Sequence, residues 1–272
     1  MKKLFNSIML SIMMAVFLVS CGGGASKSNN NIVISGSSSV APLMFKLAAK
    51  FEEINSDYKV VVETSDSTIG VQDTINDNNA IGMASRALTE EEANQLDSSL
   101  LCNDALVIIA NKNSSISQIT EEELYNLFIN NTPISDISKA ISREDGSGTK
   151  SAFKDLTSIG KDAPLPATVE VLNGTGQVKT SVAADGAKIG YISLGAIDDS
   201  VKALSYKAKD QADYVVPTVE NVANGSYKLY RPFYIFTKKG KEQSEATKMF
   251  LDFLNTEEAK NVINSSGYVA IN

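Results

Sequence analysis

Residues 142–153 have the sequence Ser-Arg-Glu-Asp-Gly-Ser-Gly-Thr-Lys-Ser-Ala-Phe, and other parts of the chain repeat this pattern. Glycines let the backbone approach a ligand closely, and Ser147 or Thr149 suits the cap of the apolar, periodic helix that follows. The first amides of a helix have no internal partners and lie at the positive end of its dipole, so such a turn can bind an anion. Arg143 adds a planar guanidinium that can donate two hydrogen bonds side by side. This stretch alone leaves two interpretations open, an ordinary helix cap and an anion site.

The N-terminus has the features of a secretory signal. Lys2 and Lys3 precede an apolar run at 8–19, which is too short to span a membrane. The run ends in Leu-Val-Ser-Cys-Gly, which resembles a bacterial lipobox and implies cleavage before Cys21 and attachment of lipid to its sulfur. The alternative is a plain signal peptide with a chance cysteine. We expect residues 1–20 to be the signal peptide and residues 21–30 to be a flexible, lipid-anchored tether.

The composition excludes several kinds of chemistry. The chain has no histidine, which removes Ser-His-Asp and Cys-His catalysis and a favoured zinc ligand. Apart from Cys21 only Cys102 is present, so the mature chain has no internal disulfide, and its apolar neighbours favour a small buried residue. The net charge is −7, whereas nucleic-acid binding requires a basic face, so we expect no nucleic-acid partner. Attraction for an anion must therefore be local, from amides and one or two arginines.

Two further segments have the order strand, hydroxyl-rich turn, helix. Residues 32–39 predict a buried strand that ends in a Gly-Ser-Ser-Ser turn, and residues 40–54 keep helical spacing. Residues 58–64 predict another strand, which leads through a Ser-Asp-Ser-Thr turn at 65–68 into a short helix. Each hydrogen bond to a charged partner contributes about 1.5–3 kcal/mol. Three such turns, one of them with an arginine, therefore favour an anion site over unrelated helix caps.

Strands alternate with helices along the rest of the chain. Thr-x-x-Glu capping boxes begin helices at Thr89 and Thr120, so we interpret both acidic clusters as helix starts rather than metal sites. The alternation predicts an α/β fold with mostly parallel sheets, whose ligands bind beyond the carboxyl ends of the strands. The other predicted strands lie at 80–84, 104–110, 140–142, 169–172, 189–193 and 230–236.

The same turn admits two enzymatic alternatives. A nucleotide phosphate loop is disfavoured because the lysine at 150 follows the threonine, against the order Gly-x-x-x-x-Gly-Lys-[Ser/Thr]. A Ser-Lys hydrolase stays open, since Ser147 and Lys150 have the Ser-x-x-Lys spacing. Gly148 and the flanking Arg-Glu-Asp fit an anion turn better, so we expect no enzymatic activity. Arg86 is either a cation for the ligand or a partner in a structural salt bridge at the edge of the site.

These segments together resemble the phosphate-binding lipoproteins of bacterial phosphate ABC transporters. The most specific match is Arg-x-Asp-Gly-Ser-Gly-Thr at 143–149, and the next is the Gly-Ser-Ser-Ser-Val-Ala-Pro segment at 36–42. The resemblance extends over nearly all of the mature chain. The other matching segments are Ser67–Val71, Ile81–Arg86, Ile189–Ser193 and Tyr230–Pro232.

The resemblance implies an α/β, two-lobed periplasmic-binding-protein fold of type II with two connecting hinge strands. It places lobe one at 31–106 plus 232–272 and lobe two at 107–231. The implied protein is a non-enzymatic monomer without a cofactor, exported and anchored to the cell membrane. It binds inorganic phosphate between the lobes and delivers it to the permease subunits of a phosphate ABC transporter. The alternatives are a receptor for sulfate or molybdate, an exported Ser-Lys hydrolase, and an adhesin or scaffold.

The resemblance also implies which residues contact phosphate. Arg143 would form the charged pair, and Asp145 would hold its guanidinium in place. Serine and threonine hydroxyls and the amides of a helix start would supply the other hydrogen bonds. The expected phosphate-binding residues are Ser38, Ser39, Ser67, Ser85, Arg143, Ser147, Gly148 and Thr149.

One position departs from the resembled family. Many of its members carry an aspartate where this chain has Arg86, and that carboxylate accepts the proton that phosphate has and sulfate lacks. Burying a carboxylate against an unprotonated anion is strongly unfavourable, which is how it discriminates between the two. Here the acceptor must come from elsewhere, with Asp66 and Asp145 as candidates, or the selectivity must be weaker.

Overall fold

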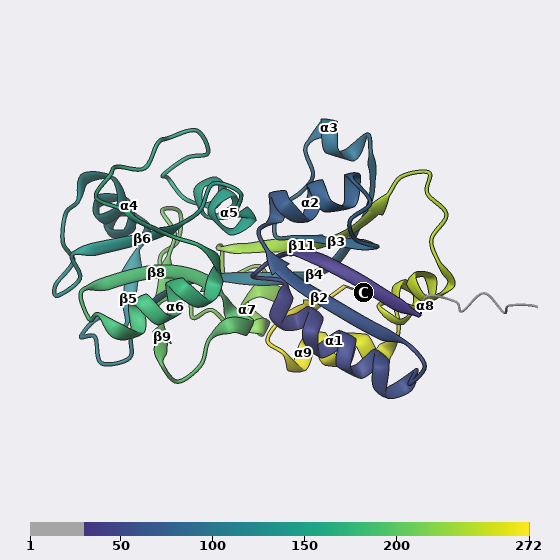
Figure 1. Ribbon diagram of the computed structural model, residues 1–272. Coiled ribbons are helices and arrows are strands. Elements are labelled where there is room, and N and C mark those ends of the chain that lie inside the picture. Colours follow the sequence, from purple (N-terminus) through teal and green to yellow (C-terminus); the bar gives the residue numbers. More distant parts are fainter. Residues whose placement is uncertain (1–29, 272) are drawn as a thin grey trace, which may run out of the picture.

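A computed structural model describes residues 30–271, which form two α/β lobes side by side (Figure 1). Each lobe has its own large hydrophobic core. Lobe one surrounds the core that contains Ile34 and Phe51, and lobe two surrounds the core that contains Ile108 and Phe128. The expected signal peptide, almost all of the tether and the lipid-bearing Cys21 lie outside the described residues.

Lobe one is built on parallel strands covered by helices. β1 pairs in parallel with both β2 and β3, so Ile34 lies beside Val62 on one side and Ile81 on the other. Phe51 of α1 packs edge-on against Phe250 of α8, with ring centroids 5.1 Å apart. The elements of lobe one are β1 (Asn31–Ser37), α1 (Ala41–Ile54), β2 (Lys59–Ser65), α2 (Ser67–Ile75), β3 (Ile81–Ala84), α3 (Glu90–Ala93), α8 (Glu245–Phe253), α9 (Glu257–Ser265) and β12 (Val269–Ala270).

Lobe two repeats this arrangement around a second set of parallel strands. β6 pairs in parallel with β7 and β8, and Phe153 of α5 stacks on Tyr191 of β8 with centroids 3.9 Å apart. The elements of lobe two are β5 (Gln118–Thr120), α4 (Glu121–Asn130), β6 (Lys139–Arg143), α5 (Gly148–Leu156), β7 (Glu170–Leu172), α6 (Gly174–Ala184), β8 (Lys188–Ser193), the 3-10 turn η1 (Leu194–Ala196), β9 (Val201–Ala203), β10 (Ser205–Lys207) and α7 (Val219–Ala223).

Two long strands connect the lobes, as the fold class predicts. β4 (Leu96–Asn111) runs from lobe one into lobe two, and β11 (Tyr230–Lys238) returns beside it. The main sheet has the order β2-β1-β3-β11-β4-β8-β6-β7. The expectation of mostly parallel pairing holds for β1 with β2 and β3 and for β6 with β7 and β8. β4 and β11 pair antiparallel because one leads from lobe one into lobe two and the other leads back. Each also pairs antiparallel with a strand of one lobe, β11 with β3 and β4 with β8.

The two predicted helix starts at acidic clusters are confirmed. Thr89 and Thr120 each form a capping box with the glutamate three residues later. The helix after Thr89 is only four residues long, however, and β4 begins at Leu96, well before the strand predicted at 104–110. Each helix within residues 30–271 is too short or too polar to cross a membrane.

Two glycines bring the start of α2 close to the end of β1. Gly36 has a φ of +136°, which favours glycine, and a Cβ atom at Gly70 would lie only 2.7 Å from the Gly36 Cα atom. A larger residue at either position would push the helix away from the strand. The Ser38 amide also donates to the Ser65 carbonyl oxygen at 2.9 Å, so the turns after β1 and β2 lie side by side.

Candidate anion-binding site

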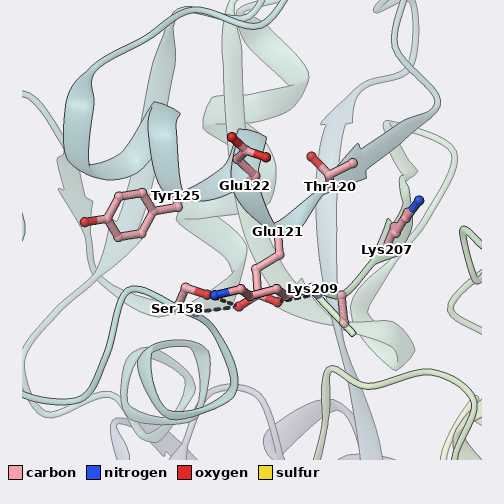
Figure 2. A pocket seen from close by; sticks show the side chains of 8 residues that line it. Thr120, Glu121, Glu122, Tyr125, Ser158, Lys207 and Lys209 are labelled. Atoms are coloured by element: carbon pink, nitrogen blue, oxygen red, sulfur yellow. Dashed lines mark hydrogen bonds between the residues drawn. The ribbon is translucent and has the colours of Figure 1, made fainter. Parts of the chain in front are cut away.

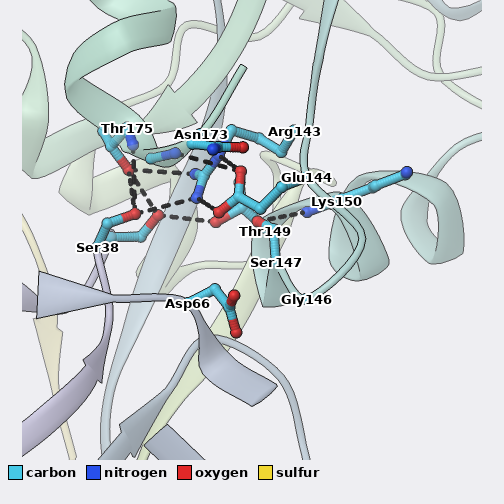
Figure 3. A network of polar contacts seen from close by, with 12 residues as sticks. Ser38, Asp66, Arg143, Glu144, Gly146, Ser147, Thr149, Lys150, Asn173 and Thr175 are labelled. Carbon is cyan, nitrogen blue, oxygen red and sulfur yellow. Dashed lines mark hydrogen bonds and ion pairs between the residues drawn. The ribbon is translucent and has the colours of Figure 1, made fainter. Parts of the chain in front are cut away.

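Polar turns from both lobes meet between them (Figure 3). The turn after β1 supplies Ser38 and Ser39, the end of β3 leads to Ser85, and β6 ends at Arg143. Helices α2, α5 and α6 begin in the same region. A pocket at this place is lined by Ser38, Thr64, Ser65, Asp66 and Ile69 from lobe one and by Glu144, Gly146, Asn173 and Gly174 from lobe two.

Arg143 is the buried cation of this region, and only 1% of its surface is exposed. Its Nη2 donates to Ser38 Oγ of lobe one at 3.0 Å, and its Nη1 donates to Thr175 Oγ1 of lobe two at 3.3 Å. Nε and Nη2 also donate to the Glu144 carboxylate at 2.8 and 2.6 Å. Burial raises the pKa of Glu144, but the hydrogen bonds and charge of Arg143 outweigh it, so the net pKa is lowered.

The residue that holds Arg143 differs from the expected one. Asp145 forms no hydrogen bond or ion pair with Arg143 but pairs with the Lys150 ammonium at 2.5 Å, and its side chain is fully exposed. The Ser147 amide donates to the Glu144 carbonyl oxygen at 3.1 Å, which closes a tight turn with Asp145 at its outer corner. Glu144 therefore holds the guanidinium, the role that the resemblance implied for Asp145.

Hydroxyl groups from the two lobes meet in a buried cluster. Ser39 Oγ lies 2.7 Å from Thr149 Oγ1 and 3.0 Å from Thr175 Oγ1, so it joins lobe one to both α5 and α6. Ser85 Oγ lies 3.4 Å from Ser67 Oγ and 3.5 Å from Thr149 Oγ1. All five side chains are buried. Hydroxyls both donate and accept hydrogen bonds, so this cluster can adapt to the oxygens of an anion.

The start of α5 fits tightly against lobe one. Ser147 caps the helix by accepting from the Lys150 amide at 3.3 Å. A Cβ atom at Gly148 would lie 2.5 Å from Ser67 Oγ and 2.8 Å from Ser85 Oγ. The Gly148 position therefore needs glycine for the lobes to approach one another this closely. Of the expected phosphate-contact residues, Ser147 uses its hydroxyl to cap α5. The other seven lie in the region where the two lobes meet.

A buried tyrosine supports the end of β6. The Tyr191 hydroxyl lies 2.7 Å from Ser142 Oγ and accepts from the Arg143 amide at 3.3 Å. Burial raises the pKa of Tyr191 to about 12, so the phenol is neutral at physiological pH. Because Phe153 stacks on its ring, Tyr191 fixes β6 relative to α5 and thereby the position of the Arg143 backbone.

Arg86 and Asp66 lie at the edge of the region. Arg86 donates to both carboxylate oxygens of Glu92, at 2.7 and 2.8 Å, which favours the structural salt bridge over a cation for the ligand. Asp66 caps α2 by accepting from the Ile69 amide at 2.8 Å. Both candidate proton acceptors thus have other partners, Asp66 at this cap and Asp145 on the Lys150 ammonium.

Two residues of this region, Glu144 and Thr175, are not among the contact residues expected from the sequence. Glu144 has no signal of its own in the sequence, because the resemblance implies the orienting role for the neighbouring Asp145. Thr175 lies in the segment Asn-Gly-Thr-Gly at 173–176, which follows β7 and begins α6. This segment repeats the strand–turn–helix order of the other turns, and that order is the signal that could have identified Thr175.

A second pocket lies in lobe two (Figure 2). Glu121 is one of the residues that line it. The Glu121 carboxylate accepts hydrogen bonds from the Ser158 amide at 2.7 Å, from the Lys209 amide at 2.8 Å and from the Ser158 hydroxyl. These bonds tie the start of α4 to two loops. The carboxylate therefore has a structural role that accounts for its position.

The chain has two α/β lobes, a polar region between them, and two connecting strands, β4 and β11. This is the architecture of a two-lobed solute-binding protein. The family model described as a PBP superfamily domain matches residues 23–258, and the chain belongs to this family. The chain is 38% identical over 138 residues to the phosphate-binding protein PstS 2 of Streptococcus agalactiae, and this match covers 48% of the chain and 45% of the relative. The match thus spans less than half the length of that relative.

Two solved structures align with this chain over their own full length. One is a putative phosphate ABC transporter substrate-binding protein with bound phosphate from Clostridium perfringens, which is 30% identical, with a TM-score of 0.81 over 89% of this chain and 100% of that chain. The other is an ABC-type phosphate transport receptor from Vibrio cholerae, 34% identical, with a TM-score of 0.68 over 88% of this chain and 100% of that chain.

Proposed function

We propose that this chain binds inorganic phosphate between its lobes and delivers it to the membrane permease of a phosphate ABC transporter. The observation that carries the proposal is the burial of Arg143 between hydroxyls of both lobes, where Ser38 and Thr175 accept from its guanidinium. The names of the relatives and the bound phosphate of the Clostridium perfringens structure support the same ligand. The chain carries a net charge of −7, so attraction for phosphate must come from these local groups.

We propose that the anion contacts the arginine, the hydroxyl cluster and the amides at the start of α5. A helix N-terminus and a buried guanidinium both stabilise negative charge, and neutral hydroxyls complete the coordination. Closure of the lobes about β4 and β11 would then bury the anion. The proposed phosphate-binding residues are Ser38, Ser39, Ser67, Ser85, Arg143, Ser147, Gly148 and Thr149.

We also propose how the whole chain is organised. Lobe one comprises residues 31–106 and 232–272, and lobe two comprises residues 107–231. The two separate cores support this division except at Ala105 and Leu106, which pack in the core of lobe two. After export, lipid on Cys21 anchors the monomeric receptor to the cell membrane. The tether at 21–30 gives the lobes reach toward the permease subunits.

A Ser-Lys hydrolase is not supported by the geometry of its two candidate residues. The Lys150 ammonium forms an ion pair with the Asp145 carboxylate at 2.5 Å, so another partner engages the group that would have to act as the catalytic base. Ser147 Oγ meanwhile accepts from the Lys150 backbone amide as a helix cap.

Isothermal titration calorimetry of the mature chain with phosphate, sulfate and molybdate tests the proposal. We expect phosphate to bind and the other two anions to bind more weakly. Arg86 stands where many members of the resembled family carry a proton-accepting aspartate. The ratio of phosphate affinity to sulfate affinity is therefore the informative quantity. Tight sulfate or molybdate binding without phosphate heat would replace the proposed ligand by one of its rivals.

A further inference from the structure

Thr175 lies at the point where candidate contact residues of both lobes meet. Only 4% of its surface is exposed. Its Oγ1 atom lies 3.0 Å from Ser39 Oγ and 3.4 Å from Ser38 Oγ, and it accepts from Arg143 Nη1 at 3.3 Å. One hydroxyl thus contacts three side chains that are each proposed to contact phosphate (Figure 3).

The backbone at the start of α6 faces the same region. The Thr175 amide donates to Ser38 Oγ at 3.2 Å, and the Gly174 amide donates to Glu144 Oε2 at 3.2 Å. Asn173 makes no side-chain cap, so these amides bond to the turn after β1 and to the residue that holds Arg143. Thr175 is consequently held by both its amide and its hydroxyl.

We infer that Thr175 is a further phosphate-contact residue, which sets the fit of the anion between Ser39 and Arg143. This inference rests on the proposed function. A threonine hydroxyl donates one hydrogen bond and accepts others. It can therefore donate to an anion oxygen while it still accepts from Arg143 Nη1, or accept from the proton-bearing oxygen of phosphate. The nearby carboxylates have other partners, since Glu144 binds Arg143 and Asp66 caps α2.

Three variants of the mature chain separate a contact role from a packing role. Thr175→Val keeps the shape but removes the hydroxyl, Thr175→Ser keeps the hydroxyl but removes the methyl group, and Thr180→Val removes an exposed hydroxyl from the same helix. Calorimetry should show that Thr175→Val lowers phosphate affinity by about tenfold or more, the effect of one hydrogen bond to a charged partner. Thr175→Ser and Thr180→Val should bind phosphate like the wild type.

Thermal unfolding without phosphate and a crystal structure of the wild type with phosphate complete the test. Wild-type affinity in Thr175→Val would overturn the inference, as would equal losses in the valine and serine variants together with lowered thermal stability. So would a phosphate complex in which Thr175 Oγ1 lies beyond hydrogen-bond distance, more than about 3.5 Å, from every phosphate oxygen. Absence of phosphate binding by the wild type would instead refute the proposed function itself.

Discussion

The Glu144 carboxylate holds the guanidinium of its neighbour Arg143 through hydrogen bonds of 2.8 Å from Nε and 2.6 Å from Nη2. Arg143 is thereby turned so that Nη1 and Nη2 reach Thr175 and Ser38 on opposite lobes. Because their charges are opposite, the pair of Arg143 and Glu144 carries almost no net charge. Hydroxyls and helix amides must therefore supply much of the attraction for a multiply charged anion, and the arginine supplies its geometry.

Replacement of Arg143 should weaken phosphate binding severely. Arg143→Ala should make phosphate binding less favourable by ~2–5 kcal/mol, as when one partner of a buried charge pair is truncated. The reason is that the Glu144 carboxylate is then left beside the anion without its cation. Calorimetry with phosphate measures the effect. An affinity equal to that of the wild type would exclude Arg143 from the site.

Arg86 is a second arginine near the cleft, and its substitution provides the matched control for Arg143→Ala. Its guanidinium is taken up by Glu92, so Arg86→Met should leave phosphate affinity close to the wild-type value while it lowers the stability of lobe one. Calorimetry and thermal unfolding of the same variant give both quantities. A loss of affinity as large as that of Arg143→Ala would make Arg86 a ligand cation after all.

Gly148→Ala should prevent the lobes from closing fully. The added methyl group would lie 2.5 Å from Ser67 Oγ and 2.8 Å from Ser85 Oγ, far inside van der Waals contact. We expect phosphate affinity to drop and the radius of gyration in the presence of phosphate, measured by small-angle X-ray scattering, to exceed that of the wild type. Gly176→Ala is the control, because a Cβ atom there meets nothing within 4 Å. Identical behaviour of the two variants would contradict the tight fit.

The connecting strands carry a buried ion pair whose disruption should destabilise the protein. Arg231 of β11 binds Asp104 of β4 at 3.2 Å, and their side chains are 3% and 0% exposed. Arg231→Met leaves the carboxylate buried without its cation, so the free energy of unfolding at neutral pH should fall by about 3–5 kcal/mol. Urea unfolding measures this loss. The double variant Asp104→Leu/Arg231→Met should lose less, and an equal or larger loss would argue against an unpaired buried charge as the cause.

Asp104 should also make stability depend on pH. Burial raises its pKa to about 6 from an ordinary value of 3.8, although Arg231 and Ser193 act in the opposite direction. The folded chain therefore keeps a proton that the unfolded chain has lost, so the contribution of Asp104 is greatest below about pH 4 and falls as the pH rises to about 6. About two pKa units correspond to about 3 kcal/mol.

The variant Asp104→Asn isolates this term, because it keeps every other titrating group. The stability difference, wild type minus variant, should decrease between pH 4 and pH 6 and then stay level, as measured by urea unfolding at each pH. A difference that is independent of pH would mean that Asp104 ionises in the folded chain near its ordinary pKa.

The local elements could be predicted because their signals are local. Apolar spacing, the Thr89 and Thr120 capping boxes and the Gly-Ser turns fix where helices begin, whichever way the chain is folded. The antiparallel centre of the sheet could not be predicted this way. It depends on β4 and β11 lying beside one another, although they are separated by more than a hundred residues.

The sequence by itself determined that hydroxyl-rich turns follow strands, that Arg143 stands beside a helix start, and that histidine-based catalysis is absent. Only the tertiary structure decided that Glu144 rather than Asp145 holds the guanidinium, that Arg86 pairs with Glu92, and that Thr175 joins the cluster. Backbone preferences and helix caps act over a few residues, so a sequence records them directly. The direction of a side chain at a turn, and the meeting of turns from separate lobes, depend on packing between distant segments.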